Sequence, residues 1–220
     1  MPRRPGRFEG LYLVTSPVRP IPRLASIVAA AIDGGASLVQ FREKDPAPAD
    51  RLEAGRAVAS VCRPRGVPFL VNDDADLARR LDADGVHIGR GDTPTEAARS
   101  MLGPTAIVGV TLYGDGDEGE EEAARRAGAD YLAVGPFFPS PTKPQEAVIP
   151  LTVLDGVVRR ARLPVFAIGG ITAERARLLA RHGIAGVAVV SAIMGAPNPR
   201  DAAVKILDAF ESGAAHPRPD

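Results

Sequence analysis

Short apolar segments alternate with longer amphipathic segments along most of the chain. The apolar segments are hydrophobic at nearly every position, which is typical of strands buried on both faces. The segments between them repeat apolar residues at helical spacing and place charged residues on the other face. The predicted strands are 11–15, 38–45, 68–71, 85–88, 106–110, 131–134, 165–168 and 187–190. The predicted helices are 24–32, 49–62, 75–81, 94–101, 120–127, 151–161, 173–181 and 201–211.

This alternation predicts a parallel sheet covered by helices, because crossover helices join parallel strands and bury them. Eight strand–helix units favour a single (β/α)8 TIM barrel of the α/β class over an open doubly wound sheet. We expect one domain over residues 1–220, ordered from about 8 to 211, with flexible tails at 1–6 and 212–220. The site of such a barrel lies at the carboxyl ends of its strands.

Composition and charge restrict the setting. The chain has 220 residues, of which 45% are hydrophobic, and this suits one sizeable core. Because 27 basic residues balance 27 acidic ones, no long-range field favours nucleic acid or an anionic membrane. The single cysteine, Cys62, cannot form an internal disulfide, and no apolar run has transmembrane length. We expect a cytoplasmic protein that binds neither nucleic acid nor membranes, and the sequence predicts no oligomeric state.

The segment LVQFREKD, residues 38–45, carries a polar face. The period of two along a strand puts Gln40, Arg42 and Lys44 on the same side. Burying an unpaired charge costs free energy, so two cations beside an amide are not expected in a hydrophobic core. These side chains therefore either face an anion in a polar cavity or lie on a solvated edge strand.

Several polar residues at strand ends have a structural explanation. Asn72, Asp73 and Asp74 follow the third strand, and one of them is expected to cap the next helix. Asp92 or Thr93 could cap the helix of the fourth unit, which has a proline in its first turn.

The same carboxylates also suit a metal site. The third and fourth strands are neighbours in a barrel, so Asp73 and Asp92 can converge on one Mg²⁺ that bridges to a phosphate. Placed beside Arg42 and Lys44, this pair predicts a diphosphate site.

A second group of residues suits another phosphate. The proline-rich loop after the sixth strand presents Ser140, Thr142 and Lys143. Gly170 follows the seventh strand and Ser191 the eighth, where backbone N–H groups of such barrels often hold phosphate. Two anion sites on opposite sides of the barrel mouth predict an enzyme that joins two phosphorylated small molecules.

The remaining candidates are weaker. His87 lies within a strand, where a lone histidine is more often packed or hydrogen-bonded than catalytic. Thr111 places a hydroxyl at the end of the fifth strand. The segment 114–119, GDGDEG, matches the dinucleotide fingerprint GxGxxG. Its acidic residues would repel a pyrophosphate, so a solvated loop is the better interpretation.

Six motifs carry a family resemblance. In order along the chain they are VQFREKD, VNDDADLA, ADGVHIGRGD, ADYLAVGPFFPSPTKP, FAIGGIT and GVAVVSAI. From about Tyr12 to Met194 the chain resembles the thiamine phosphate synthases. The resemblance implies a transferase that joins 4-amino-2-methyl-5-(diphosphooxymethyl)pyrimidine to a thiazole phosphate, giving thiamine phosphate and diphosphate. It implies Mg²⁺ as the cofactor and loss of diphosphate before capture by the thiazole nitrogen, without a protein nucleophile.

The resemblance also implies residue roles. The pyrimidine diphosphate would be held by Gln40, Phe41, Arg42, Glu43, Lys44, Asn72, Thr111 and Lys143. The thiazole phosphate would be held by Ser140, Pro141, Thr142, Gly170, Val190 and Ser191. Mg²⁺ would be held by Asp73 and Asp92. The residues expected to act in catalysis are Arg42, Lys44, Lys143 and Thr111.

Four positions depart from the family pattern. Thr111 stands where a serine is usual, Tyr113 replaces a histidine, Ser140 a threonine and Phe41 a leucine. Two alternatives share the barrel: a thiazole tautomerase, and a non-catalytic regulator that binds thiazole phosphate or thiamine phosphate. The tautomerases commonly lack the second Mg²⁺ aspartate, and a pure binder has no need to activate a leaving group, so the two retained carboxylates favour the synthase.

Overall fold

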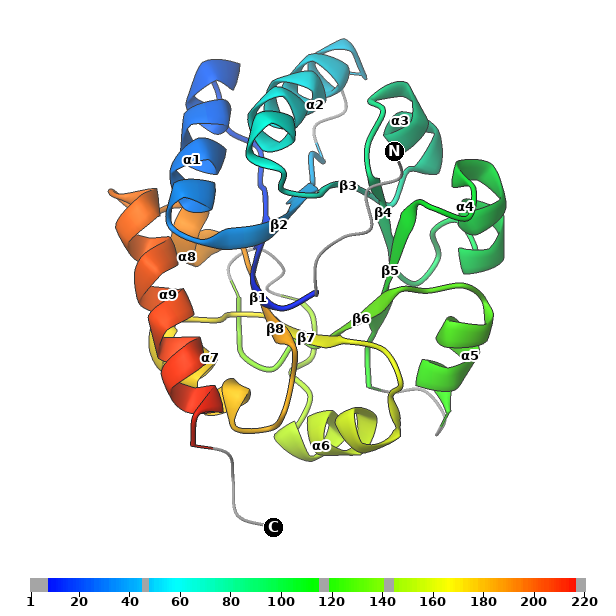
Figure 1. The fold of residues 1–220 in the computed structure, drawn as a ribbon, viewed down its shortest axis with the longest axis vertical. Coiled ribbons are helices and arrows are strands. Elements are labelled where there is room, and N and C mark those ends of the chain that lie inside the picture. Colours follow the sequence, from blue (N-terminus) through cyan, green and yellow to red (C-terminus); the bar gives the residue numbers. More distant parts are fainter. Residues whose placement is uncertain (1–7, 45–47, 115–118, 141–144, 217–220) are drawn as a thin grey trace.

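A closed ring of parallel strands forms the centre of the computed structural model (Figure 1), which describes residues 8–44, 48–114, 119–140 and 145–216. The strands are β1 (Gly10–Val14), β2 (Ala36–Phe41), β3 (Phe69–Asn72), β4 (Gly85–Ile88), β5 (Ile107–Leu112), β6 (Tyr131–Val134), β7 (Val165–Ile168) and β8 (Gly186–Val189). Each strand pairs with its neighbours in chain order, and β8 pairs with β1 to close the ring. The predicted (β/α)8 barrel is confirmed.

Helices surround the ring on its outside (Figure 1). They are α1 (Ile21–Asp33), α2 (Pro48–Cys62), α3 (Ala75–Arg80), α4 (Thr95–Leu102), α5 (Glu120–Arg126), α6 (Leu151–Arg160), α7 (Ala173–Ala180) and α9 (Pro199–Ala214). Two short elements were not predicted, the 3₁₀ turn η1 (Arg63–Arg65) and helix α8 (Ser191–Met194). Both are too short to show a hydrophobic period in the sequence. Within the described ranges, no helix combines the length and the hydropathy of a membrane span.

The last helix differs from the expected chain end. α9 continues to Ala214, although the sequence predicted a flexible tail from residue 212. Gly213 explains the extension, because it packs directly on α7: a Cβ added there would lie 2.2 Å from the Arg177 carbonyl oxygen. The expected tail at residues 1–6 and the last residues, 217–220, lie outside the described ranges.

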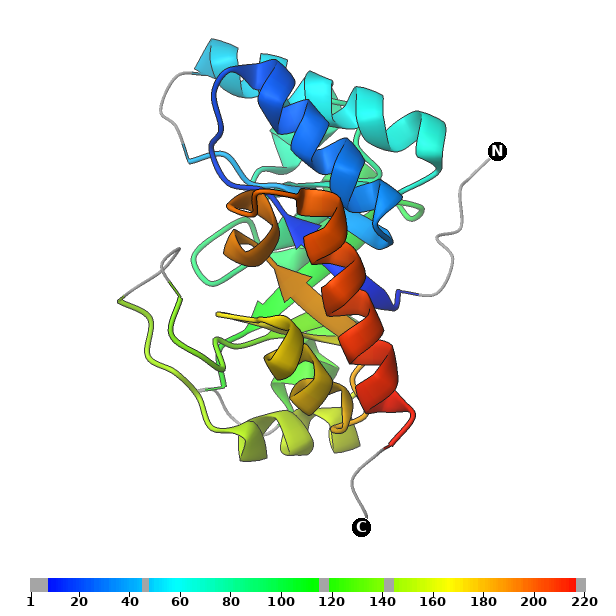
Figure 2. The same cartoon turned by 90° about the vertical axis from the view of Figure 1, so that its left-hand side faces the viewer.

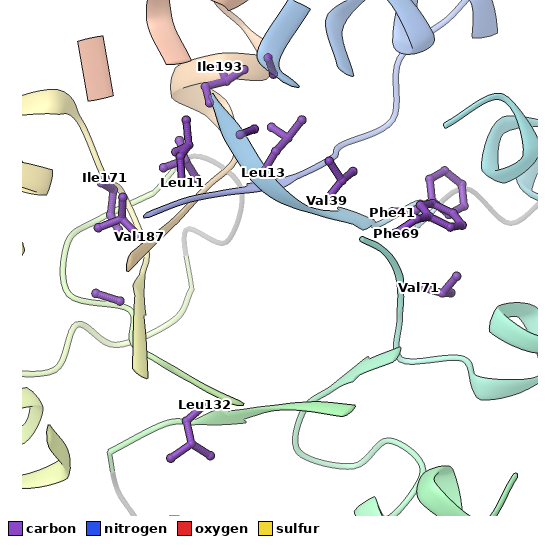
Figure 3. Packing of buried hydrophobic residues seen from close by; sticks show 14 of the residues in the cluster. Leu11, Leu13, Val39, Phe41, Phe69, Val71, Leu132, Ile171, Val187 and Ile193 are labelled. Atoms are coloured by element: carbon purple, nitrogen blue, oxygen red, sulfur yellow. The ribbon is translucent and has the colours of Figure 1, made fainter. Parts of the chain in front are cut away.

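Strand side chains alternate between two hydrophobic layers. The outward side chains pack against the helices, and Figure 3 shows Leu13, Val39, Phe41 and Phe69 pointing away from the centre of the ring. The inward side chains form a second cluster inside the barrel, which contains Tyr12, Val14, Leu38, Leu70, Ile107, Tyr131, Phe166 and Ala188. The loops that follow the strands, including the loop between β6 and α6, extend on one side of the barrel (Figure 2).

Candidate active site

A cavity of about 350 Å³ opens at the carboxyl ends of the strands. Every strand of the barrel contributes at least one residue to its lining. The predicted site residues in the lining are Gln40, Arg42, Lys44, Asn72, Asp73, Asp92, Thr111, Ser140, Gly170, Val190 and Ser191. Both predicted anion sites therefore open into one cavity.

The cationic side of the cavity is built by β2 and the residues that follow it. β2 pairs with both β1 and β3, so the edge-strand interpretation of its polar face is wrong. The Thr15 hydroxyl oxygen accepts a hydrogen bond from the Arg42 backbone N–H at 2.9 Å and fixes the chain where β2 ends. Beyond it, Lys44 Nζ lies 2.6 Å from Asp73 Oδ2. The segment after β2 thus presents Arg42 and Lys44 to the cavity, beside a carboxylate, and the strand itself ends at Phe41, earlier than the predicted residue 45.

Phe41 and Glu43 do not line the cavity with their side chains, which is a correction to the expected pyrimidine diphosphate site. Neither is among the lining residues, although Arg42 between them is. The Phe41 ring is buried outside the barrel, with its centroid 6.4 Å from that of Phe69. The Glu43 carboxylate is also buried and forms an ion pair with Arg19 at 3.0 Å.

Asp73 and Asp92 form a carboxylate pair on the adjacent wall. Asp73 has a left-handed backbone with φ +65°, and its N–H donates to the His87 carbonyl oxygen at 2.8 Å. Burial raises the pKa of Asp92, and its hydrogen bond with Asp73 raises it further. Burial alone would also raise the pKa of Asp73, but hydrogen bonds from Lys44 and Asp92 outweigh it and lower this pKa. The pair therefore favours one shared proton or a bound cation over two bare negative charges.

The helix caps next to this pair are now assigned. Asp74 caps α3, because its Oδ1 accepts the Leu77 N–H at 2.8 Å, and this confirms that one residue of the Asn72–Asp74 group has a capping role. The capping hypothesis for the fourth unit is wrong. α4 has Pro94 at its N-cap without a side-chain hydrogen bond, and the Asp92 carboxylate instead accepts the Gly89 N–H at 2.8 Å.

A chain of hydrogen bonds crosses the barrel interior among residues that line the cavity. Gln40 Nε2 donates to the Tyr12 hydroxyl at 2.5 Å, and the hydroxyls of Tyr12 and Tyr131 are 2.8 Å apart. His87 lies between Tyr131 and Thr111, with Nδ1 2.8 Å from the Tyr131 hydroxyl and Nε2 2.7 Å from Thr111 Oγ1. His87 is hydrogen-bonded, as expected. The sequence analysis missed both tyrosines, although a tyrosine at an inward position of an apolar strand was the available signal.

The opposite side of the cavity is formed by glycines after β7. Gly169 and Gly170 have φ values of +101° and +61°, which an L side chain would adopt only with strain. A Cβ at Gly170 would lie 2.4 Å from the Pro139 carbonyl oxygen, so the β6–α6 loop sits directly against this turn. Arg175 fixes the contact, because its Nη1 donates to the Gly170 carbonyl oxygen at 2.5 Å and its guanidinium lies 4.5 Å from the centroid of the Phe138 ring.

The sequence analysis missed Arg175 and Phe138, since nothing local links them. It also left out Arg90 and Glu146, which line the cavity. Three predicted residues of the β6–α6 loop, Pro141, Thr142 and Lys143, lie outside the described residues.

Tyr113 lines the same cavity at the position where the resembling family usually has a histidine. The Arg90 guanidinium lies 4.7 Å from the centroid of its ring. At this position the cavity therefore has a cation held against an aromatic face.

Comparison with known proteins gives the same family that the sequence motifs resemble. The family model described as thiamine monophosphate synthase matches residues 11–193. A thiamine-phosphate synthase of Thiobacillus denitrificans is 43% identical over 201 residues, covering 91% of this chain and 94% of the relative. One of Halorhodospira halophila is 41% identical over 207 residues, covering 94% and 97%.

Solved structures agree with this family and with the barrel fold. The thiamine phosphate pyrophosphorylase of Pyrococcus furiosus superposes with a TM-score of 0.82 at 34% identity, covering 94% of this chain and 97% of the other. A 3-hexulose-6-phosphate synthase, with a TM-score of 0.66 at 17% identity, shares the fold. The family and the enzyme class expected from the sequence motifs are confirmed. The chain belongs to the thiamine monophosphate synthase family.

Proposed function

We propose that this protein condenses 4-amino-2-methyl-5-(diphosphooxymethyl)pyrimidine with a thiazole phosphate and releases thiamine phosphate and diphosphate. The observation that carries the proposal is the single cavity with two unlike halves. One half combines Arg42 and Lys44 with a carboxylate pair, and the other has a glycine turn held by Arg175. Two phosphorylated substrates bound in these halves would meet over the centre of the barrel.

The carboxylate pair fits Mg²⁺. Burial and the neighbouring Asp73 raise the pKa of Asp92, and two carboxyl groups that face each other in this way suit a hard divalent ion. Among the described residues no cluster of three or more His, Cys, Asp or Glu side chains could enclose a metal. This suits Mg²⁺, which usually takes one or two carboxylates and completes its shell with water and substrate phosphates. When bound, Mg²⁺ would supply positive charge to the leaving diphosphate.

The residues of the chain then have defined tasks. Arg42 and Lys44 neutralise the charge that develops on the diphosphate as the C–O bond breaks and its electron pair leaves with the oxygen. The electron-rich aminopyrimidine stabilises the resulting methylene cation. The thiazole nitrogen, positioned through its phosphate at the glycine turn, donates its lone pair to form the new C–N bond. Lys143, although outside the described residues, is proposed to add to the cationic half. No side chain has to act as a nucleophile.

The test is formation of thiamine phosphate from the two substrates, with Mg²⁺ and then with EDTA. We expect product with the metal and none with the chelator. Product formation at the same rate with EDTA as with Mg²⁺ would refute the role of Mg²⁺. No product under either condition would refute the synthase.

Asp73 and Asp74 provide a matched pair of variants. Asp73→Ala removes a carboxylate of the cavity, and we expect turnover to fall at least about 100-fold with little change in melting temperature, because removal of one preorganised stabilising group commonly costs this much. Asp74→Ala removes the cap of α3, and we expect it to lower the melting temperature by about 2–4 °C while turnover remains, since a lost cap costs about 1 kcal/mol. Near-normal turnover of Asp73→Ala would contradict the assignment.

A further inference from the structure

The buried hydrogen-bond chain begins and ends at residues that line the cavity. Gln40 on β2 and Thr111 on β5 line the cavity, as do Tyr12 and His87, and the hydroxyls of Tyr12 and Tyr131 and the imidazole of His87 connect the two ends. We propose that this hydrogen-bond chain determines substrate specificity. Tyr12, Tyr131 and His87 are positioning residues that turn the Gln40 side-chain carbonyl oxygen toward the cavity. In this orientation Gln40 selects a pyrimidine with an amino group over its oxo counterpart. This inference rests on the proposed function.

The donors along the chain are coupled. Gln40 Nε2 donates to the Tyr12 oxygen, so the single hydroxyl hydrogen of Tyr12 goes to Tyr131, and that of Tyr131 goes to His87 Nδ1. His87 then carries its proton on Nε2 and donates to Thr111 Oγ1. Turning the Gln40 amide around would reverse every one of these bonds. The amide orientation of Gln40 and the directions of the other three hydrogen bonds therefore change together.

The surroundings keep the chain rigid and protonated. Tyr12 and Tyr131 each lie against Phe166, with ring centroids 5.4 and 5.6 Å apart, and His87 stacks on Tyr131 at 5.5 Å. Burial is the largest cause that raises the pKa of both tyrosines, so each phenol keeps the hydrogen that it donates. Breaking one bond would leave a buried polar group without a partner, which is costly.

The Gln40 end offers the acceptor that an amino group requires. Within the described part of the chain, Gln40 Oε1 accepts no hydrogen bond, and Gln40 lines the cavity, so this oxygen is available to a ligand donor. Thr111 accepts from His87 and can point its own hydrogen at a ligand acceptor. An aminopyrimidine offers an N–H donor next to a ring-nitrogen acceptor. Its oxo counterpart offers a carbonyl next to a ring N–H, which would set acceptor against acceptor at Gln40.

Which nitrogen of His87 is protonated tests the direction of the hydrogen bonds without any substrate. The protein has three histidines, so the ¹⁵N spectrum of the imidazoles is simple, and His87→Gln identifies the signal that belongs to this residue. We expect Nε2 to carry the proton and Nδ1 to be bare. A proton on Nδ1 would overturn the proposal.

Binding tests the selectivity. We compare dissociation constants of the aminopyrimidine diphosphate and its oxo analogue by calorimetry, without the thiazole phosphate, so that the chemical step does not enter. For the unaltered protein we expect at least about 100-fold preference for the amino compound, because a site built to pair with one polar group strongly rejects its mismatch. Tyr12→Phe removes the acceptor that holds Gln40 Nε2, and we expect the preference to fall at least about tenfold.

Phe166→Leu is the matched control. It disturbs the packing of the same rings but removes no hydrogen bond, so we expect a lower melting temperature and an unchanged preference. If Tyr12→Phe does not fold, Tyr131→Phe breaks the next bond and is expected to lower the preference in the same way. An unchanged preference in a folded variant of either tyrosine would refute the device. If the unaltered protein binds the amino compound but forms no thiamine phosphate, the proposed reaction fails while the selectivity result stands on its own.

Discussion

Asp92→Asn is expected to make the metal-free protein more heat-stable and, at the same time, to remove its stabilisation by Mg²⁺. Asparagine keeps an oxygen that can accept the Gly89 N–H, which Asp92 accepts at 2.8 Å, so the local loop is retained. What the substitution removes is one of two carboxyl groups that share a hydrogen bond. The stability of the free protein and the affinity for the metal should therefore change in opposite directions.

The structure sets the size of both effects. Two unit charges about 4 Å apart repel by about 4 kcal/mol at an effective dielectric constant of about 20. The ammonium of Lys44, 2.6 Å from Asp73, and the open cavity offset most of this, so we expect a gain near 1 kcal/mol, or about 2–4 °C in melting temperature. Mg²⁺ at 100 times its dissociation constant would stabilise the unaltered protein by about 2.7 kcal/mol.

The assay is thermal unfolding at pH 7, in EDTA and across a Mg²⁺ titration. We expect Asp92→Asn to melt above the unaltered protein in EDTA and below it at saturating Mg²⁺. Asp74→Asn serves as the control, because it changes the neighbouring carboxylate but not the pair, and it should keep the response to Mg²⁺. A variant that is less stable in EDTA, or one stabilised by Mg²⁺ as much as the unaltered protein, would refute the reasoning.

Four further outcomes are expected. Gly170→Ala should raise the KM for the thiazole phosphate more than that for the pyrimidine diphosphate, because a Cβ would lie 2.4 Å from the Pro139 carbonyl oxygen and the left-handed backbone costs about 1–2 kcal/mol; steady-state kinetics with each substrate varied would show this. Burial raises the pKa of Cys62 to about 12, so iodoacetamide at pH 8 should label it only after unfolding. The folded chain keeps this proton while the unfolded chain loses it above about pH 9, so the melting temperature should fall as the pH rises past that value. Phe69→Ala empties a buried position against Phe41 and should lower the free energy of unfolding by about 3–5 kcal/mol in urea titrations.

Much of the architecture follows from local patterns. Buried parallel strands and amphipathic helices each leave their own period in the sequence, so the eight alternating units sufficed to predict the barrel. The period of two expected over residues 38–45 also predicted that Gln40, Arg42 and Lys44 share a face, and all three line the cavity although β2 ends at Phe41. It could equally have placed Phe41 and Glu43 on the opposite face, but the family resemblance assigned the whole run to the substrate.

Choices between neighbouring residues needed the backbone. Asp73 and Asp74 are chemically identical and adjacent, and either carboxylate suits a helix cap or a cation. The structure separates them, because Asp73 adopts φ +65° and meets Lys44 and Asp92, while Asp74 has extended backbone and accepts the N–H of Leu77. Dihedral angles of single residues leave no periodic pattern that a sequence analysis can use.

Contacts between distant residues were decided by closure of the barrel. Tyr12 and Tyr131 are separated by 119 positions in the chain, yet their hydroxyls are 2.8 Å apart. Arg175 likewise reaches Phe138 only because the loops after β6 and β7 lie side by side. The sequence by itself determined the alternation of eight strands with eight longer helices, since this depends on near neighbours. Only the tertiary structure decided which polar side chains share the barrel interior, because hydrogen bonds require distances that strand register and ring closure alone set.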